Sequence, residues 1–534
     1  MTRFTSVSPR YSEGTISKDQ LLLATLTSAK EQCQSGFLAR PDSKRWKYDL
    51  PINWKTSPFK DRNWEFSLSA WRILDSLIND CIDSKSSEWL PHAMDIILDW
   101  YDFNIAQDNT FTMQWYDMAA GLRAMRLAFM FEQIALENIV CDLGTTEILD
   151  EIATAHVNFL STPEHIALNN HGIFQVCGLH LLAQHWCRPY KFSQIDQYCK
   201  DCMRKIVDEN YTAQGVQKEA APDYQKYVTE IFLRVMRGFD FTKEFQDLVK
   251  TAHRLLPYFA FPDGMLPPIG DSQGDKAVNC LTQNTKSDLA RLKNKDVVLK
   301  DLSKSGLIIV RSPADMPQQS QWMLYFTAMA HTRSHKHADE LSFCYYNSGH
   351  PIITDPGKYA YEYDKWRDYA LSANSHSNVS IAERPVIPAS IGQFSGSFLK
   401  TVENRGDFLL LRGEINRAEL FDHARRIRVY ENGEILVEDT IKNLSRNTLQ
   451  SNMCIDPSVE VEMMSDSALL RTTSGDTFLL SVQGHDFFRR AYGEKEPLLG
   501  WNSKAYKKMS PTHLLIASGK PGEDARIVWR LTKP

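Results

Sequence analysis

The chain has 534 residues, a hydrophobic share of 43% and a formal net charge of -5. This length favours two domains over one, and the apolar content is ample for large cores. The small charge, spread along the chain, excludes a general nucleic-acid binder but is compatible with local basic patches for an acidic ligand.

The N-terminal stretch and the cysteines bear on location. Residues 1–26 contain no unbroken apolar core of the kind that secretory signals carry. No run of the sequence is long and apolar enough to span a bilayer. The ten cysteines are scattered, as in proteins whose thiols stay reduced. We therefore expect a cytoplasmic protein, with export by a route that needs no signal as the alternative. Cys199 and Cys202 are interpreted as neighbours on a helical turn rather than as a metal or redox site.

In the first half, apolar residues recur at three- and four-residue steps, which predicts helices. The predicted helical segments are 64–82, 89–105, 115–136, 171–186, 195–211 and 224–239. The stretch 260–305, with prolines, glycines and a charged run, is predicted to link this half to the next.

Beyond residue 305 the pattern changes to short apolar or alternating runs, which predict strands. The tetrapeptide ENGE at 431–434 separates two such runs and predicts a hairpin with a type I′ turn. We therefore expect an α+β chain with a helical domain over residues 1–300 and an antiparallel β-sandwich domain over residues 301–534.

The segment HTRSHKHADELSF, residues 331–343, gathers three histidines with four charged residues. Such a cluster is costly to bury, so it is a metal site, an acid–base site or an exposed polar loop. If it is a strand, His335 and His337 face one side, because side chains alternate. His337, Asp355 and His376 together make a nitrogen and oxygen ligand set that suits zinc. Loop histidines without a ligand are the alternative interpretation.

Three further groups could carry chemistry. The tetrapeptide NNHG at 169–172 opens a predicted helix, where an asparagine could serve only as an N-cap. Tyr224 begins another helix and could be half-buried packing. Trp115, Tyr116 and Arg123 lie on one helical stretch, where they could stack on sugars and pair with carboxylates or sulfates, or pack in the core.

Six short motifs follow one another along the chain. They are NNHG (169–172), E-x-x-P-x-Y (219–224), PIGDS (268–272), H-x-H-x-D-x-x-S-F (335–343), DPG (355–357) and SHSNVSI (375–381). In this order they resemble the heparinase II/III-like polysaccharide lyases. The resemblance implies an incomplete (α/α) toroid followed by antiparallel sheets, with the substrate cleft between them.

The resemblance also implies β-elimination at a uronic acid of an acidic polysaccharide or oligosaccharide, such as a glycosaminoglycan, alginate or capsule glycan. The product would carry a 4,5-unsaturated uronate. Asn170 and His171 would lie at the substrate carboxylate, and Tyr224 would exchange a proton at the scissile bond. His335 would be the histidine partner in proton abstraction.

Metal and substrate contacts complete the expected site, and of these the metal ligands follow from the same resemblance. His337, Asp355 and His376 match the positions that hold a structural zinc. Glu219 and Arg333 are expected to contact the substrate, as are Trp115, Tyr116 and Arg123. In a protein kept inside the cell, that substrate would be an imported oligosaccharide or a glycan that the cell makes.

The chemistry explains the residue types. Removal of the C5 proton next to a carboxylate builds negative charge, which hydrogen-bond donors such as Asn170 and His171 disperse. One group must take the proton and another must protonate the leaving oxygen. A glycoside hydrolase, the first alternative, needs two facing carboxylic acids, whereas Glu219 and Asp223 share a single turn. A non-catalytic glycan-binding or assembly protein, the second alternative, would not need the four candidate catalytic residues together.

Overall fold

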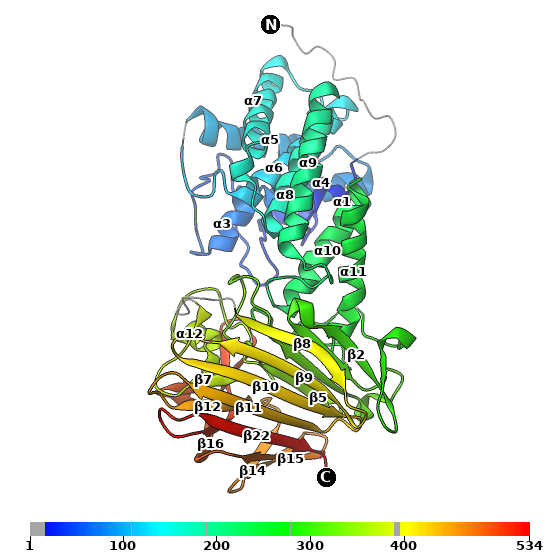
Figure 1. Ribbon diagram of the computed structural model, residues 1–534. Helices are drawn as coiled ribbons and strands as arrows, with labels where there is room; N and C mark the ends of the chain where they lie inside the picture. The colour runs from blue at the N-terminus through cyan, green and yellow to red at the C-terminus, as the bar shows by residue number, and fades with distance from the viewer. Residues whose placement is uncertain (1–15, 108, 187–188, 278, 389–395) are drawn as a thin grey trace. The chain divides into compact units, whose positions relative to one another are not determined.

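The computed structural model describes residues 16–107, 109–186, 189–277, 279–388 and 396–534 (Figure 1). The chain forms two compact units: one comprises the residues up to Asn210 with Glu230–Val249, and the other comprises Tyr211–Thr229 with Lys250–Pro534. The units do not divide the chain at a single residue, and the domain boundary expected at residue 300 stays a prediction. Each unit is described by itself.

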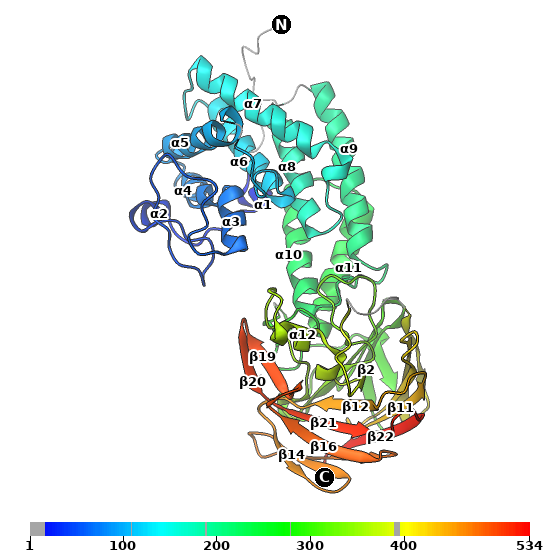
Figure 2. The ribbon, with the colours of Figure 1, turned by 90° about the vertical axis from the view of Figure 1, so that its left-hand side faces the viewer.

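The first unit is helical, as predicted. Its helices are α1 (Lys18–Leu21), α2 (Ala29–Ser35), α3 (Arg62–Ser69), α4 (Asp75–Ser84), α5 (Leu90–Tyr101), α6 (Asp117–Ala135), α7 (Leu143–Leu160), α8 (Asn170–Trp186) and α9 (Pro189–Asn210), while α10 (Pro222–Gly238) and α11 (Lys243–Phe259) contribute to both units. Helices α8 and α9 run side by side (Figure 2).

One predicted helix is two helices in the structure. The segment 64–82 breaks between α3 and α4, because Trp71 adopts a left-handed φ of 56°. Its indole is fully buried and packs edge-on against Trp100 of α5, with ring centroids 5.3 Å apart. Helical periodicity continues through the break, so the apolar spacing alone could not reveal it.

Helix α6 is buried along nearly its whole length and packs against α8. A Cβ at Gly121 would lie 2.3 Å from the Phe174 carbonyl oxygen, and one at Gly178 would lie 2.1 Å from the Gly121 carbonyl oxygen. Only glycine lets the two backbones approach so closely. The polar side chains of α6 are satisfied inside the unit; Arg126, for example, pairs with Asp75 of α4.

The second unit is built from antiparallel sheets, which confirms the predicted class. In the order of their pairing, a six-stranded sheet contains β1 (Leu289–Arg291), β2 (Asp296–Leu302), β3 (Leu307–Arg311), β4 (Trp322–Thr327), β5 (Phe343–Asn347) and β6 (His350–Ile353). An eight-stranded sheet contains β13 (Glu460–Met463), β14 (Ser467–Arg471), β15 (Thr477–Gln483), β22 (Ala525–Thr532), β11 (Ile435–Asn443), β10 (Phe421–Tyr430), β9 (Phe408–Asn416) and β8 (Ser397–Asn404). A four-stranded sheet contains β16 (Phe487–Tyr492), β21 (His513–Ser518), β12 (Leu449–Cys454) and β7 (Val379–Ile381).

Smaller elements complete this unit. They are the two-stranded ribbons β17 (Glu494–Lys495) with β18 (Leu498–Leu499) and β19 (Trp501–Ala505) with β20 (Lys508–Pro511), and the helix α12 (Lys365–Leu371). Asp364 is the N-cap of helix α12, because its side chain accepts hydrogen bonds from the backbone N–H groups of Trp366 and Arg367. This cap fixes where the helix starts, and therefore where the side chain of Arg367 emerges.

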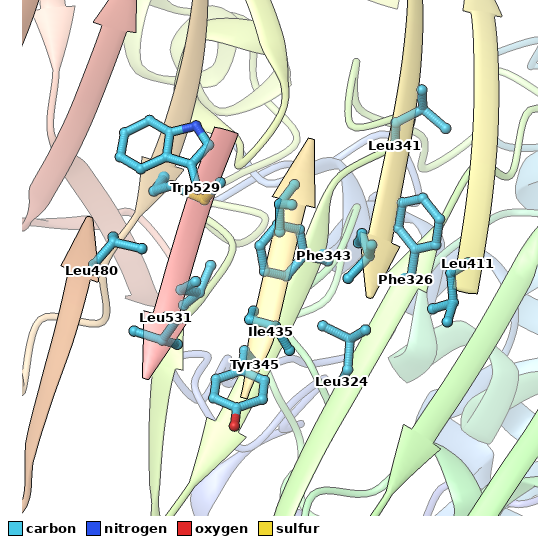
Figure 3. Close-up of a cluster of buried hydrophobic side chains, with 14 of the residues drawn as sticks. Leu324, Phe326, Leu341, Phe343, Tyr345, Leu411, Ile435, Leu480, Trp529 and Leu531 are labelled. Atoms are coloured by element: carbon cyan, nitrogen blue, oxygen red, sulfur yellow. The ribbon is translucent and has the colours of Figure 1, made fainter. Parts of the chain in front are cut away.

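The core of the sandwich lies between the six-stranded and eight-stranded sheets. Figure 3 shows Leu324 and Phe326 of β4 and Phe343 of β5 in one cluster with Leu411 of β9 and Trp529 of β22. The alternate residues of β4 pack into a second cluster with the end of α11. Both faces of the six-stranded sheet are therefore covered, which explains why β3, β4 and β5 are continuous apolar runs rather than alternating ones.

Two local predictions need correction. The stretch 260–305 is more than a link, because β1 and β2 lie in it and begin the six-stranded sheet. The hairpin at ENGE joins β10 to β11 as predicted, but Gly433 alone has a positive φ there. Its N–H donates to the Tyr430 carbonyl at 3.0 Å, which makes a type I turn followed by a left-handed glycine instead of a type I′ turn.

Candidate active site and metal centre

Asp271 accepts hydrogen bonds from two histidines of the 331–343 segment. His335 Nδ1 lies 2.9 Å from Asp271 Oδ2, and His337 Nε2 lies 3.0 Å from Oδ1. Arg367 of α12 donates to both oxygens, at 2.5 and 3.0 Å. Burial alone would raise the pKa of Asp271, but these partners hold it well below its usual value. The carboxylate is therefore ionised and serves three side chains as an acceptor.

The two histidines do not lie on a strand, so the shared strand face considered for them does not apply. They belong to an irregular segment between β4 and β5, and His335 has a left-handed φ of 57°. Such a conformation costs about 1–3 kcal/mol in a residue other than glycine. Asp271 supports it, because its backbone N–H donates to the His335 carbonyl at 2.9 Å. A Cβ at Gly270 would lie 2.8 Å from that carbonyl oxygen, so glycine permits the approach.

Tyr224, in the first turn of α10, stacks on His335 with ring centroids 3.8 Å apart and an interplanar angle of 22°. Its hydroxyl lies 2.6 Å from the hydroxyl of Tyr361. Burial, and then the neighbouring Tyr361, raise the pKa of Tyr224 above its usual value, and burial raises that of Tyr361 to about 12. Both phenols are therefore protonated at neutral pH. The ammonium group of Lys358 lies 4.9 Å from the ring centroid of Tyr361.

His337, Asp355 and His376 lie together and are fully buried. One ligand atom from each lies within 4.8 Å of the others. In the described part of the chain, His337 Nδ1, Asp355 Oδ1 and His376 Nε2 have no hydrogen-bond partner, although buried polar atoms are normally satisfied. The other His376 nitrogen, Nδ1, donates to Asp355 Oδ2 at 2.8 Å. Two imidazole nitrogens and a carboxylate oxygen left in this way fit a metal ion.

Three charged residues of the 331–343 segment, Lys336, Asp339 and Glu340, are structural. Lys336 is fully buried and pairs with Asp339 and Glu340, and Glu340 also pairs with Arg417. Burial lowers the pKa of Lys336 to about 8. This network fixes the backbone on both sides of His337, because the Lys336 ammonium also donates to the His337 carbonyl at 2.7 Å.

In the first unit, the NNHG motif forms the start of α8. The Asn169 side chain accepts from the His171 backbone N–H at 2.9 Å, so Asn169 is the N-cap and Asn170 is left for another role. His171 Nδ1 lies 3.2 Å from both carboxylate oxygens of Asp117. The Tyr116 ring meets that of His171 edge-on, with centroids 5.8 Å apart. Tyr116, Asn170 and His171 are all partly exposed, as a surface for ligands requires.

The expected substrate contact of Arg123 does not fit its position. Its side chain is fully buried and donates to the carbonyls of Ser69 and Gln114 and to His156 Nε2, at 2.8, 2.6 and 3.0 Å. Each guanidinium nitrogen has a partner inside the unit, so none is available to bind a carboxylate or sulfate. Trp115 packs against His156 with ring centroids 5.0 Å apart, in the core arrangement that was the alternative.

Glu219 and Arg333 both belong to the second unit, the first buried and the second exposed, and their expected substrate contacts stay predictions. Sequence reasoning did not assign roles to Asp271, Arg367, Tyr361 or Asp117. Asp271 had a signal, because it lies inside the PIGDS motif. The others lie in stretches with no distinctive spacing.

Comparisons with known proteins agree with this arrangement. The model of the heparinase II/III N-terminus matches residues 3–298, and that of the heparinase II/III-like C-terminal region matches residues 295–530. The chain therefore belongs to the heparinase II/III-like family of polysaccharide lyases. No match was found among curated protein sequences.

Solved structures show the same fold. A heparinase III has a TM-score of 0.69 at 16% identity, with 96% of this chain and 85% of that one covered. The heparan sulfate lyase HepC from Pedobacter heparinus has a TM-score of 0.67 at 15% identity, with 99% and 85% covered. A second heparinase III structure has a TM-score of 0.69 at 13% identity, with 100% and 88% covered. The chain thus has their architecture, an incomplete (α/α) toroid followed by a β-sandwich. In the described residues, no helix combines the length and apolarity needed to cross a bilayer.

Proposed function

We propose that the protein cleaves a uronic-acid-containing acidic glycan by β-elimination and leaves a 4,5-unsaturated uronate. The observation that carries the proposal is the stacked pair of Tyr224 and His335, whose histidine is anchored on the ionised Asp271. Elimination needs one group that accepts the C5 proton and one that protonates the leaving O4. The neutral form of an imidazole, placed against a protonated phenol, supplies both groups.

The hydrogen bonds support different roles for His335 and Tyr224. An ionised carboxylate only accepts, so the nitrogen of His335 that faces Asp271 carries a proton, and Nε2 carries the lone pair of a base. Tyr224, whose pKa is raised by burial and by Tyr361, keeps the proton that a general acid gives to O4. Elimination can be syn or anti. The alternative form of this proposal therefore exchanges the two roles, with Tyr224 as the base and His335 as the acid.

The second requirement is that the site stabilises the negative charge that develops on the uronate. The carbanion that forms at C5 is stabilised when donors bind the neighbouring carboxylate, by an amount on the order of a few kcal/mol. Asn170 and His171 are our candidates for this role, with Asp117 orienting the imidazole of His171. In the second unit, Lys358 beside Tyr361 adds a cation that suits an acidic sugar.

We further propose that His337, Asp355 and His376 hold zinc. Two imidazoles and a carboxylate are a usual zinc set, and the unsatisfied atoms of all three are buried. When bound, the ion would supply a brace that fixes three separate segments of the second unit. Elemental analysis of the purified protein tests this, and well-folded protein without any bound metal would contradict it.

A glycoside hydrolase on this fold is less well supported. Hydrolysis needs two carboxylic acids with distinct roles. Near Tyr224, both oxygens of Asp271 are taken by the two histidines and Arg367. Those of Asp223 accept from the backbone N–H groups of Gln273 and Asp275, at 2.7 and 3.1 Å. These acids organise the loops around Tyr224.

The experiment is a panel of uronate polymers and oligomers followed by ultraviolet absorbance. Elimination conjugates a double bond to the carboxylate, so the product absorbs and takes up no oxygen from water. Substrate whose carboxyl is reduced to an alcohol should not be cut, because the C5 proton then loses its acidity. Labelled oxygen from water at the new anomeric carbon, without an absorbing product, would establish hydrolysis instead.

A further inference from the structure

Asp271 joins the two histidines that the proposed function separates into catalysis and metal binding. Each of its oxygens takes one imidazole, His335 on Oδ2 and His337 on Oδ1. The group is 2% exposed, so water does not replace these bonds. Arg367 donates to both carboxylate oxygens with its two Nη atoms and also donates to the Lys358 carbonyl at 2.8 Å.

This geometry determines which nitrogen of each ring carries hydrogen. A carboxylate without a proton only accepts, so both nitrogens that face Asp271 are donors. His337 then has its lone pair on Nδ1, the atom that lacks a partner in the described part of the chain. Arg367 Nη1 is the donor that competes for His337 Nε2 in these contacts, but the two atoms are 3.5 Å apart. His337 Nε2 and the acceptor Asp271 Oδ1 are closer, at 3.0 Å. By the same reasoning, neutral His335 has its lone pair on Nε2.

We propose that Asp271 is a positioning residue that sets the tautomers of His335 and His337 together. One carboxylate turns the lone pair of His337 toward Asp355 and His376, and that of His335 toward the reacting sugar. The role assigned to His335 rests on the proposed function, whereas the role assigned to His337 rests on the buried ligand group alone. Carboxylates that orient metal-bound histidines typically change metal affinity by about 10–100-fold when lost.

The variant that tests this is Asp271→Asn, which keeps the shape but has one acceptor and one donor. The amide oxygen can serve only one histidine, and its NH₂ group forces the other ring to exchange tautomers. Turnover should fall by about a hundredfold or more with little change in KM. Zinc affinity, measured by competition with a chelator, should fall by about 10–100-fold. Asp456→Asn is the matched control: Asp456 is equally buried but contacts Ser458 and Lys504 rather than either histidine.

Tautomers can be measured directly in the unaltered protein, which covers the case in which Asp271→Asn does not fold. Nitrogen-15 spectra of histidine-labelled protein, with and without added zinc, should show hydrogen on Nδ1 of His335 and on Nε2 of His337. Hydrogen on the opposite nitrogen of either ring overturns the proposal. So does a folded Asp271→Asn protein whose turnover and zinc affinity both match those of the Asp456→Asn control. If the unaltered protein cuts no uronate glycan, the proposed function fails, while the spectra and zinc affinities still decide the role of Asp271.

Discussion

Tyr224→Phe removes one oxygen atom from the candidate site and leaves the rest of the side chain in place. Among the described residues, the hydroxyl makes one hydrogen bond, 2.6 Å long, to Tyr361. The stacking on His335, at 3.8 Å between centroids, belongs to the ring and is retained. Tyr361 is 39% exposed, so its hydroxyl can bind water once its partner is gone. The loss in folding free energy should therefore be at most about 1 kcal/mol.

The effect on rate should be much larger than the effect on stability. General acid–base catalysis by a placed side chain contributes about 10²–10⁴-fold. At 1.36 kcal/mol for each factor of ten, this is roughly 2.7–5.4 kcal/mol of transition-state stabilisation. A loss of that size with an unchanged melting temperature separates a chemical role from a structural one. The assay is the initial rate of formation of ultraviolet-absorbing product, with kcat and KM determined separately.

The control is Tyr363→Phe, which removes the same atom from a side chain that is 86% exposed. Tyr363 lies on the same loop as Tyr361, so the control also reports general disturbance of that loop. Our reasoning would be refuted by a Tyr224→Phe protein whose kcat/KM stays within about threefold of that of the control. Such a result would assign the stacked ring to packing and transfer the acid role to another group.

Three further predictions concern stability and metal content. Gly178→Ala should destabilise the first unit by about 2–4 kcal/mol, because the new Cβ would lie 2.1 Å from the Gly121 carbonyl oxygen. In the control Gly144→Ala, the nearest neighbour of the new Cβ would be 3.8 Å away, so this variant should be neutral or slightly stabilising. Urea unfolding measures the free energy of unfolding of both variants. Burial and the charge of Arg123 lower the pKa of His156 to about 3, so its contribution to stability is complete above the unfolded pKa of about 6.5 and falls by roughly 1.4 kcal/mol per pH unit as pH drops toward 3. Melting temperatures should show this slope, and His156→Gln should flatten it; an unchanged slope would contradict the argument. His337→Ala should reduce bound metal from about one ion per chain to a trace and lower the melting temperature, whereas full metal content by elemental analysis would exclude His337 as a ligand.

The fold could be predicted from sequence because periodicity reports burial. The helical and β halves each have their own period, and most predicted helices appear within a few residues of their observed bounds. Breaks were missed where a backbone change leaves the periodicity intact. Trp71 is the example: an apolar residue with a left-handed φ, in a place where the spacing of its neighbours continues to predict a helix.

The site was predicted in part, because motif order identifies residue types but not contacts. His337, Asp355 and His376 are brought together as expected. Arg123 was misjudged, since a charged residue on a helix next to aromatics gives no sign that carbonyl groups will surround it. Asp271 lies within a motif, but its partners are separated from it by 64 to 96 residues. Contacts of that range are set by the packing of loops, which the local sequence does not encode.

The four-way contact at Asp271 has a consequence for how substitutions combine. Variants at distant sites usually add in free energy, whereas residues that share a hydrogen-bond network do not. His335, His337 and Arg367 all meet the same carboxylate, so loss of the carboxylate removes a large part of what each of them contributes. A substitution of any of these three residues should therefore cost less free energy in the Asp271→Asn protein than in the unaltered protein. Recovery of function in this region should therefore require paired changes, one on the carboxylate and one on a partner, rather than a series of independent single steps.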